Sequence, residues 1–254
     1  MPRGNQSMSP GNQTSHDRRR AYRVIGIVAG FLAVALLLVI SLTTRQPPAS
    51  TPEVAKPVDL AGTRAKAERG DAAAQKELGS ICARGQVVKQ DYAEAARWYR
   101  SAADQGHAGA QAALGELYEA GQGVPHDEAA AAEWYRRAAE QGHVGGQYSL
   151  AVLYVMGRGV PRDLTEAVKW YRRAAEQGNA LARYNLGMRY KDGDGVTADP
   201  VEAYAWLSLA STQSLEDAAK ARDELKRSMT REQISEGRRR ADAFAARNTV
   251  APAH

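Results

Sequence analysis

The chain has 254 residues, of which 44% are hydrophobic and 25% are charged. This composition is close to that of an average globular protein and excludes a chain that is disordered throughout. The net charge is +5, but five arginines and one aspartate lie within residues 1–23, so the remaining residues are almost neutral. Nucleic-acid-binding proteins usually carry a basic stripe on the folded part, and we therefore expect no nucleic-acid partner.

The N-terminal region is predicted to be a membrane anchor. Residues 24–42 carry no charge, and as one helix they would be about 28 Å long, close to the roughly 30 Å thickness of the hydrocarbon layer. Arginines precede this segment and only Arg45 closely follows it, which predicts a cytoplasmic tail at 1–23 and a body on the other side of the membrane. Residues 43–59 contain four prolines and are predicted to form an extended linker.

A cleaved signal peptide is the alternative for the same segment. Its apolar part would normally cover only about 7–15 residues and end at a site with small residues. The only small-residue candidate after the apolar segment is Ala49-Ser50-Thr51, which is a weak match. We therefore expect residues 24–42 to remain as a transmembrane helix.

The body of the chain is an internal repeat. Four segments align without gaps at a period of 36 residues: 70–105, 106–141, 142–177 and 178–213. Glycines, leucines and aromatic residues recur at fixed positions in these segments. All four tryptophans occupy the twenty-ninth position of a segment: Trp98, Trp134, Trp170 and Trp206.

Each repeat is predicted to be a pair of helices. In the second repeat Leu114, Leu117 and Tyr118 have the i, i+3, i+4 spacing of one helical face. Gly121 is suited to end this helix in a left-handed conformation, and Asp127 is suited to cap the next one. One pair cannot bury both of its apolar faces, so the repeats must stack. We expect each tryptophan to be buried in a seam between helices.

Three further helices are predicted around the repeats, at residues 61–69, 215–229 and 230–247. The last of them begins with a capping box formed by Thr230 and Gln233.

The repeats resemble the Sel-one-like repeat (SLR) family of bacteria, a relative of the tetratricopeptide repeats. The resemblance rests on Gly157-x-Gly159-Val160-Pro161 and on the segment Trp170 to Gly178. It implies an all-α fold: a right-handed α-solenoid of helix-turn-helix repeats over residues 60–247, after the transmembrane helix and before a flexible tail at 248–254. It also implies a scaffold that binds proteins. With the predicted anchor and the arginines before it, we expect the repeats in the periplasm and the anchor in the bacterial inner membrane.

No motif predicts a catalytic, cofactor or metal site. The Gly-x-Gly loops follow helices, whereas phosphate-binding glycine loops follow strands. His107 and His143 share one repeat position without a recurring acidic or cysteine partner, and we expect both to be exposed polar residues in a first helical turn. Cys82 replaces a tyrosine and is expected to be a small buried residue.

An enzyme is the less favoured alternative. Cysteine-rich relatives of this repeat family have been associated with β-lactam hydrolysis, but this chain has no Ser-x-x-Lys motif and lacks the cysteine pairs of those relatives. We therefore expect no enzymatic activity. A protein that binds an envelope polymer or a small ligand is the other alternative that the sequence leaves open.

The relationship to tetratricopeptide repeats also implies a binding surface. In that fold the first helix of each repeat lines a concave face, and the corresponding positions are polar in the first two repeats, with Lys76, Arg84, Glu116 and Glu119. In the last two repeats they are apolar and form what we call the apolar strip: Tyr148, Val152, Val155, Met156, Leu181, Tyr184 and Met188. Contiguous apolar surface is typical of binding sites, so we expect a partner segment to bind there. Alternatively, the closing helices, with Ile234 and Phe244, fold back over the strip.

Overall fold

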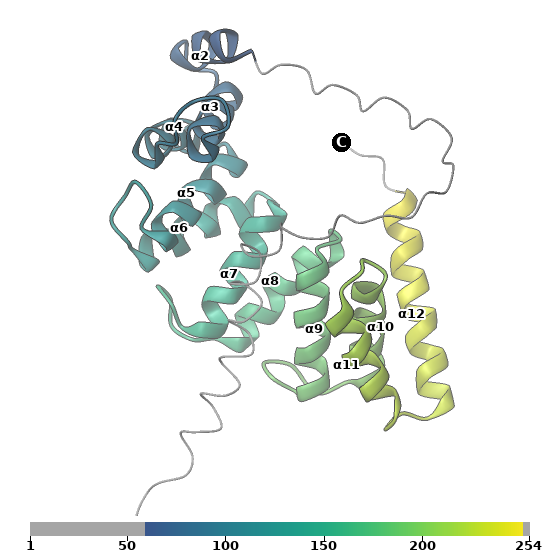
Figure 1. The fold of residues 1–254 in the computed structure, drawn as a ribbon. Helices are drawn as coiled ribbons and strands as arrows, with labels where there is room; N and C mark the ends of the chain where they lie inside the picture. The colour runs from purple at the N-terminus through teal and green to yellow at the C-terminus, as the bar shows by residue number, and fades with distance from the viewer. Residues whose placement is uncertain (1–58, 251–254) are drawn as a thin grey trace, which may run out of the picture. The chain divides into compact units, whose positions relative to one another are not determined.

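The four repeats fold as successive pairs of helices (Figure 1). The structure is a computed structural model that describes residues 59–250, and the side chains of residues 59–247. The first helices of the repeats are α3 (Ala72–Arg84), α5 (Ala108–Ala120), α7 (Val144–Met156) and α9 (Ala180–Asp192). The second helices are α4 (Tyr92–Asp104), α6 (Glu128–Glu140), α8 (Leu164–Glu176) and α10 (Pro200–Ser211). The remaining helices of this part of the chain are α2 (Leu60–Glu68), α11 (Glu216–Lys226) and α12 (Arg231–Val250).

The same type of cap begins and ends the helices of every repeat. Each second helix begins after an aspartate whose carboxylate accepts a hydrogen bond from a backbone N–H of the first turn, as Asp127 does from Ala130 at 2.9 Å. Each first helix ends at a glycine in the left-handed conformation, as at Gly121 with a φ of 66°. The predicted roles of Asp127 and Gly121 are confirmed. Pro200 does not interrupt α10, because it stands in the first turn, where no backbone N–H is needed.

The prediction that His107 and His143 are exposed was wrong. Both side chains are partly buried and serve as N-caps of α5 and α7. Nδ1 of His107 accepts a hydrogen bond from the N–H of Ala110 at 3.3 Å, and Nδ1 of His143 accepts one from Gly146 at 3.1 Å. The ring nitrogen thus replaces the side-chain oxygen that Asn179 supplies at the same position of the fourth repeat.

Apolar side chains pack between the repeats in two clusters of buried residues, one from α2 to Trp134 and one from the second repeat to α12. A leucine at the ninth position is fully buried in every repeat: Leu78, Leu114, Leu150 and Leu186. The residue after it is small because a side chain of the second helix packs directly over the backbone there, a tyrosine in the first two repeats and Leu207 in the fourth. A Cβ atom on Gly115, for example, would lie 2.8 Å from the ring of Tyr135. Cys82 is also buried, as predicted.

Three of the four tryptophans are buried as predicted, and one is not. Trp134, Trp170 and Trp206 are 7%, 9% and 0% exposed, whereas Trp98 is only partly buried. Trp134 packs into the core of the preceding repeat and is flanked by Arg100 of that repeat, at 5.6 Å from the guanidinium carbon to the ring centroid. Trp98 has only the short helix α2 before it instead of a complete repeat, so part of its ring stays accessible to solvent.

A ladder of glutamines joins each repeat to the next. Nε2 of the buried Gln111 donates to the backbone carbonyl of Ala103 in the preceding repeat at 3.1 Å. Nε2 of Gln141, at the end of the same repeat, donates to Oε1 of Gln111 at 2.6 Å. The same two bonds occur at Gln75 with Gln105 and at Gln147 with Gln177.

The fourth repeat breaks this ladder. Arg183 takes the place of the glutamine, and its Nε donates to the carbonyl of Ala175 at 3.0 Å. A guanidinium group has no acceptor atom, so Gln213 donates instead to the backbone carbonyl of Gly178 at 3.0 Å.

The closing helix α12 packs against α10. The ring of Phe244 lies 4.5 Å from that of Trp206, and Arg240 donates to Glu202 at 2.6 Å. The capping box is confirmed: the N–H of Thr230 donates to Oε1 of Gln233 at 2.8 Å, and the N–H of Gln233 donates to Oγ1 of Thr230 at 3.2 Å.

Several N- and C-terminal predictions fall outside the described residues. These are the cytoplasmic tail, the transmembrane helix at 24–42, nearly all of the linker, and residues 251–254 of the C-terminal tail. Helix α12 continues to Val250, three residues beyond its predicted end. Within residues 59–250, none of the helices combines the length and the hydropathy needed to span a bilayer.

Candidate partner-binding strip

The apolar strip lies on two neighbouring first helices. Its residues from Tyr148 to Met156 are on α7, and Leu181, Tyr184 and Met188 are on α9. Asn185 of α9 lies close enough to lower the pKa of the Tyr148 hydroxyl, and strip residues of both helices pack against the same core. The structure therefore brings the predicted residues of the two repeats together on one face, and their role in binding remains a prediction.

The strip is half-buried, whereas the sequence left two alternatives, an exposed apolar surface or a surface covered by the closing helices. All seven side chains are partly buried, and five of them pack against the core: Tyr148, Val152, Val155, Tyr184 and Met188. The ring of Tyr148 is tilted against that of Tyr171 in α8, with the centroids 5.9 Å apart. The strip thus forms the outer layer of the core, and only the outer edges of its side chains are available to a partner.

Both tyrosines of the strip present neutral hydroxyl groups. Burial raises the pKa of Tyr148, with a smaller opposing effect from Asn185. Burial also raises the pKa of Tyr184, and the carboxylates of Asp217 and Asp192 add to that increase. Each hydroxyl is therefore protonated at neutral pH and can donate a hydrogen bond to a bound segment.

Carboxylates border the strip on both sides. On the side of α5, Glu119 accepts hydrogen bonds from the hydroxyl of Tyr135 at 2.9 Å and from Arg158 at 3.2 Å. Desolvation raises the pKa of the neighbouring Glu116, Glu119 raises it further, and the more distant Lys76 lowers it. On the side of α11, Asp217 lies close enough to Tyr184 to influence the pKa of its hydroxyl. The α5 border thus combines Glu116 with an ion pair between Glu119 and Arg158, which also contacts Sδ of Met156 at 4.0 Å, whereas the α11 border carries the carboxylate of Asp217.

The closing helices do not cover the strip in the described part of the chain. Helix α12 packs on α10, where Phe244 contacts Trp206, while α11 follows α9 as a further first helix would. Lys191 of α9 lies 3.5 Å from Glu224 of α11. The sequence analysis missed Asp217 as a border residue because it did not treat α11 as a continuation of the row of first helices.

The fold defines the class of protein, an all-helical repeat solenoid, and the comparison with family models identifies the family. The model of the Sel1 repeat matches at residues 72–107, 108–143, 144–179 and 180–215, which together are more than half of the chain. The chain therefore belongs to the Sel1 repeat family, and the resemblance stated from the sequence is confirmed.

Solved structures of similar fold include two SLR proteins. A Sel1 repeat protein from Oxalobacter formigenes is 36% identical with a TM-score of 0.62, and the match covers 65% of this chain and 48% of that one. A protective antigen of uropathogenic Escherichia coli with an SLR fold is 26% identical with a TM-score of 0.49, and the match covers 77% and 52%. The chain thus spans about half the length of these two proteins. No curated protein matches the chain.

Proposed function

We propose that this protein is a non-catalytic interaction scaffold, tethered to the bacterial inner membrane by residues 24–42, and that its apolar strip binds a segment of a partner protein. The observation that carries the proposal is the strip itself: partly exposed apolar side chains from two adjacent repeats that no described helix covers. Repeat solenoids use such extended faces to bind partners. The proposal needs no metal or cofactor.

The charges around the strip favour a particular kind of partner segment. Its apolar side chains would contact Tyr148 and Tyr184, and basic side chains on either side would face Glu116 and Asp217. Complementary charge contributes mainly to the choice of partner and to the association rate. Methionine adapts its shape to different apolar groups, which suits Met156 and Met188 to this surface.

The test compares two double variants of the full-length chain in a neutral detergent. Tyr148→Ala with Tyr184→Ala removes the two aromatic anchors of the strip. Tyr118→Ala with Tyr154→Ala removes two partly buried tyrosines of first helices whose hydroxyls instead accept hydrogen bonds from Arg100 and Arg136 of the preceding repeats. A partner isolated by the unmodified chain should be lost from the strip variant and retained by the control.

Melting temperatures of both variants separate binding from folding. Full retention by a strip variant with an unchanged melting temperature would remove the strip from consideration. Capture of cell-wall fragments instead of a protein would favour the alternative of an envelope-polymer binder.

The proposed topology has its own test. A phosphatase that is active only outside the cytoplasm, fused after Gly178, should be active if the repeats lie in the periplasm. Activity of a cytoplasm-dependent reporter at the same junction would reverse the proposed orientation.

A further inference from the structure

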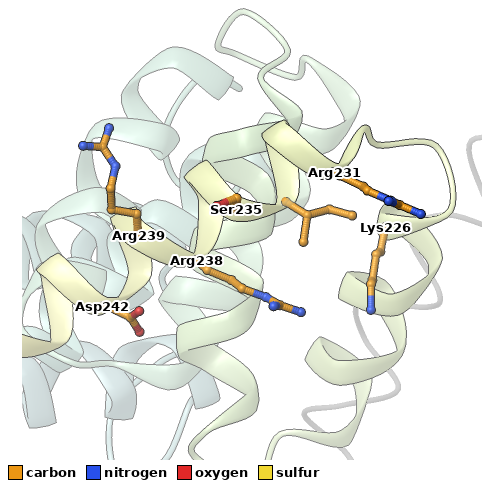
Figure 2. A pocket seen from close by; sticks show the side chains of 7 residues that line it. Lys226, Arg231, Ser235, Arg238, Arg239 and Asp242 are labelled. Atoms are coloured by element: carbon orange, nitrogen blue, oxygen red, sulfur yellow. The ribbon is translucent and has the colours of Figure 1, made fainter.

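A basic cleft lies between α11 and α12, apart from the apolar strip (Figure 2). It has a volume of about 570 Å³ and is lined by Lys226, Arg231, Ile234, Ser235, Arg238 and Asp242, with Arg239 at its edge. It shares no residue with the strip. Of these residues the sequence analysis named only Ile234, on a helix that could fold over the strip, and the cleft forms where residues of two helices meet.

The cleft has more positive charge than its own carboxylates neutralise. Arg239 is paired with Glu236 at 2.6 Å, and Asp242 is the one acidic residue of the lining. Lys226 and Arg231 are exposed, and within residues 59–247 no carboxylate lies within ion-pair distance of either. The cleft therefore offers two free cations to a ligand.

Arg238 is held in place at the opposite side of the opening. Its Nε donates to the hydroxyl of Tyr204 in α10 at 3.4 Å. The residue is exposed, so its terminal nitrogens are accessible to a ligand. Figure 2 shows Lys226 and Arg238 extending from different helices toward the same opening, with Arg231 beside Lys226. Ile234 is partly buried and packs against the core, so it adds an apolar contact within the cleft.

The spacing of the cations favours an extended ligand. Arg231 and Arg238 are seven residues apart on α12, which is about 10 Å along a helix axis. One carboxylate or phosphate group is too small to contact both at their backbone spacing. In a segment extended as polyproline II, with three residues per turn and a rise of about 3.1 Å per residue, carboxylates three residues apart lie on one face about 9 Å from each other. The N–H groups of Thr230 and Gln233 at the start of α12 are already bonded within the capping box. The ligand would therefore be held by the side chains of the cleft and not by free backbone N–H groups of the helix N-terminus.

We propose that the basic cleft binds an extended acidic segment of a protein, with carboxylates facing Lys226, Arg231 and Arg238 and an apolar side chain on Ile234. This site differs from the apolar strip in place and in charge: the strip is bordered by carboxylates and fits a basic partner. The chain thus has two docking surfaces with opposite charge preferences.

The test uses a labelled extended peptide with glutamates at every third position around a leucine, and the full-length chain in a neutral detergent. Fluorescence anisotropy at low ionic strength measures its binding. Lys226→Gln with Arg231→Gln should weaken binding about tenfold, because each lost ion pair reduces affinity severalfold. Lys220→Gln with Arg227→Gln removes the same formal charge from α11 and its C-cap, outside the cleft lining, and should change binding less than about twofold.

Three further probes decide between ligand classes. A peptide with glutamine in place of glutamate should not bind. Inorganic phosphate, or anionic lipid mixed into the detergent micelles, should bind equally to the cleft variant and the unmodified chain. Equal weakening in both double variants would overturn the proposal, as would phosphate or lipid binding that depends on Lys226 and Arg231. The Tyr148→Ala, Tyr184→Ala variant should bind the acidic peptide normally. The experiment therefore tests binding at the cleft separately from binding at the strip.

Discussion

The first three repeats and the fourth repeat have different side chains at the same two positions of the second helix, directly after the tryptophan. In the first three, a tyrosine and an arginine follow the tryptophan, and the arginine contacts the tyrosine hydroxyl of the next repeat, as Arg136 does with Tyr154 at 3.4 Å. In the fourth, Leu207 and Ser208 stand at these two positions. Leu207 is fully buried, and the buried Oγ of Ser208 forms no hydrogen bond with the described residues.

The difference follows from what each repeat has as its neighbour. An inner repeat packs against another copy of itself, so one set of polar contacts recurs at each junction. The fourth repeat packs against α11 and α12, which are not repeats. Its tryptophan is covered by Phe244, and its Glu202 binds Arg240 of α12. In the fourth repeat, contacts with the closing helices thus replace the polar contacts that recur between the inner repeats.

The largest expected effect tests the burial of the tryptophans. Trp206→Ala removes a fully buried ring and should lower the free energy of unfolding by about 3–5 kcal/mol. Trp98→Ala, at the partly exposed position of the first repeat, should lower it by only about 1–2 kcal/mol. Denaturant unfolding of both variants measures the difference. Equal losses would mean that the ends of the array pack alike, contrary to the comparison.

A second prediction concerns the glutamine ladder. Gln147→Leu leaves the carbonyl of Ala139 without its side-chain donor and removes the acceptor that Gln177 uses. An unsatisfied buried polar group costs about 1–3 kcal/mol, so we expect the free energy of unfolding to fall by about that amount. Arg183→Gln should leave the stability unchanged or raise it. The substitution removes a cation whose burial lowers its pKa, and it gives the side-chain amide of Gln213 an acceptor.

We therefore expect the Arg183→Gln variant to melt at the same or a higher temperature than the unmodified chain. A clear loss of stability would show that Arg183 has a role in the fourth repeat that the ladder does not explain.

The smallest predicted effect is a dependence of stability on pH. Burial lowers the pKa of His143, and the nearby Lys76 and His107 lower it further. A group whose pKa is lower in the folded than in the unfolded chain stabilises the fold above its unfolded pKa, and this contribution is lost as the pH falls through the folded pKa. Protonation of Nδ1 also removes the acceptor that caps α7.

The His143→Asn variant provides the matched control, because Asn179 caps the fourth repeat at the same position. It should keep the cap and lose part of the pH dependence below about pH 6.5. His143→Ala should lose about 1 kcal/mol at pH 7 as well. Thermal melts between pH 5 and 8 measure both effects, and identical pH profiles for the unmodified chain and the asparagine variant would contradict the assignment.

The candidate strip was predictable only in part. The repeat period placed Tyr148 and Tyr184 at equivalent positions of two first helices, and the structure has them on one face. How deeply they are buried depends on the packing of α8 and α9, for example on Tyr171 beside Tyr148. The sequence pattern identifies a helical face, but it does not state how much of that face the neighbouring helices leave exposed.

Local features of this protein were determined by the sequence alone. The N-caps and capping boxes join residues two or three apart, such as Asp127 with Ala130 and Thr230 with Gln233. Helix boundaries and the repeat period follow from the same short-range chemistry, because these hydrogen bonds form within one helical turn. The predictions for Gly121 and Asp127 succeeded for this reason.

Contacts between distant residues were decided by the tertiary structure. The glutamine ladder joins residues thirty positions apart, such as Gln111 and Gln141. The packing of Phe244 on Trp206 and the opening between Lys226 and Arg238 depend on where two helices dock. An apolar helical face predicts that this face will be buried. Which helix packs against it depends on the shapes of all the helices that could pack there.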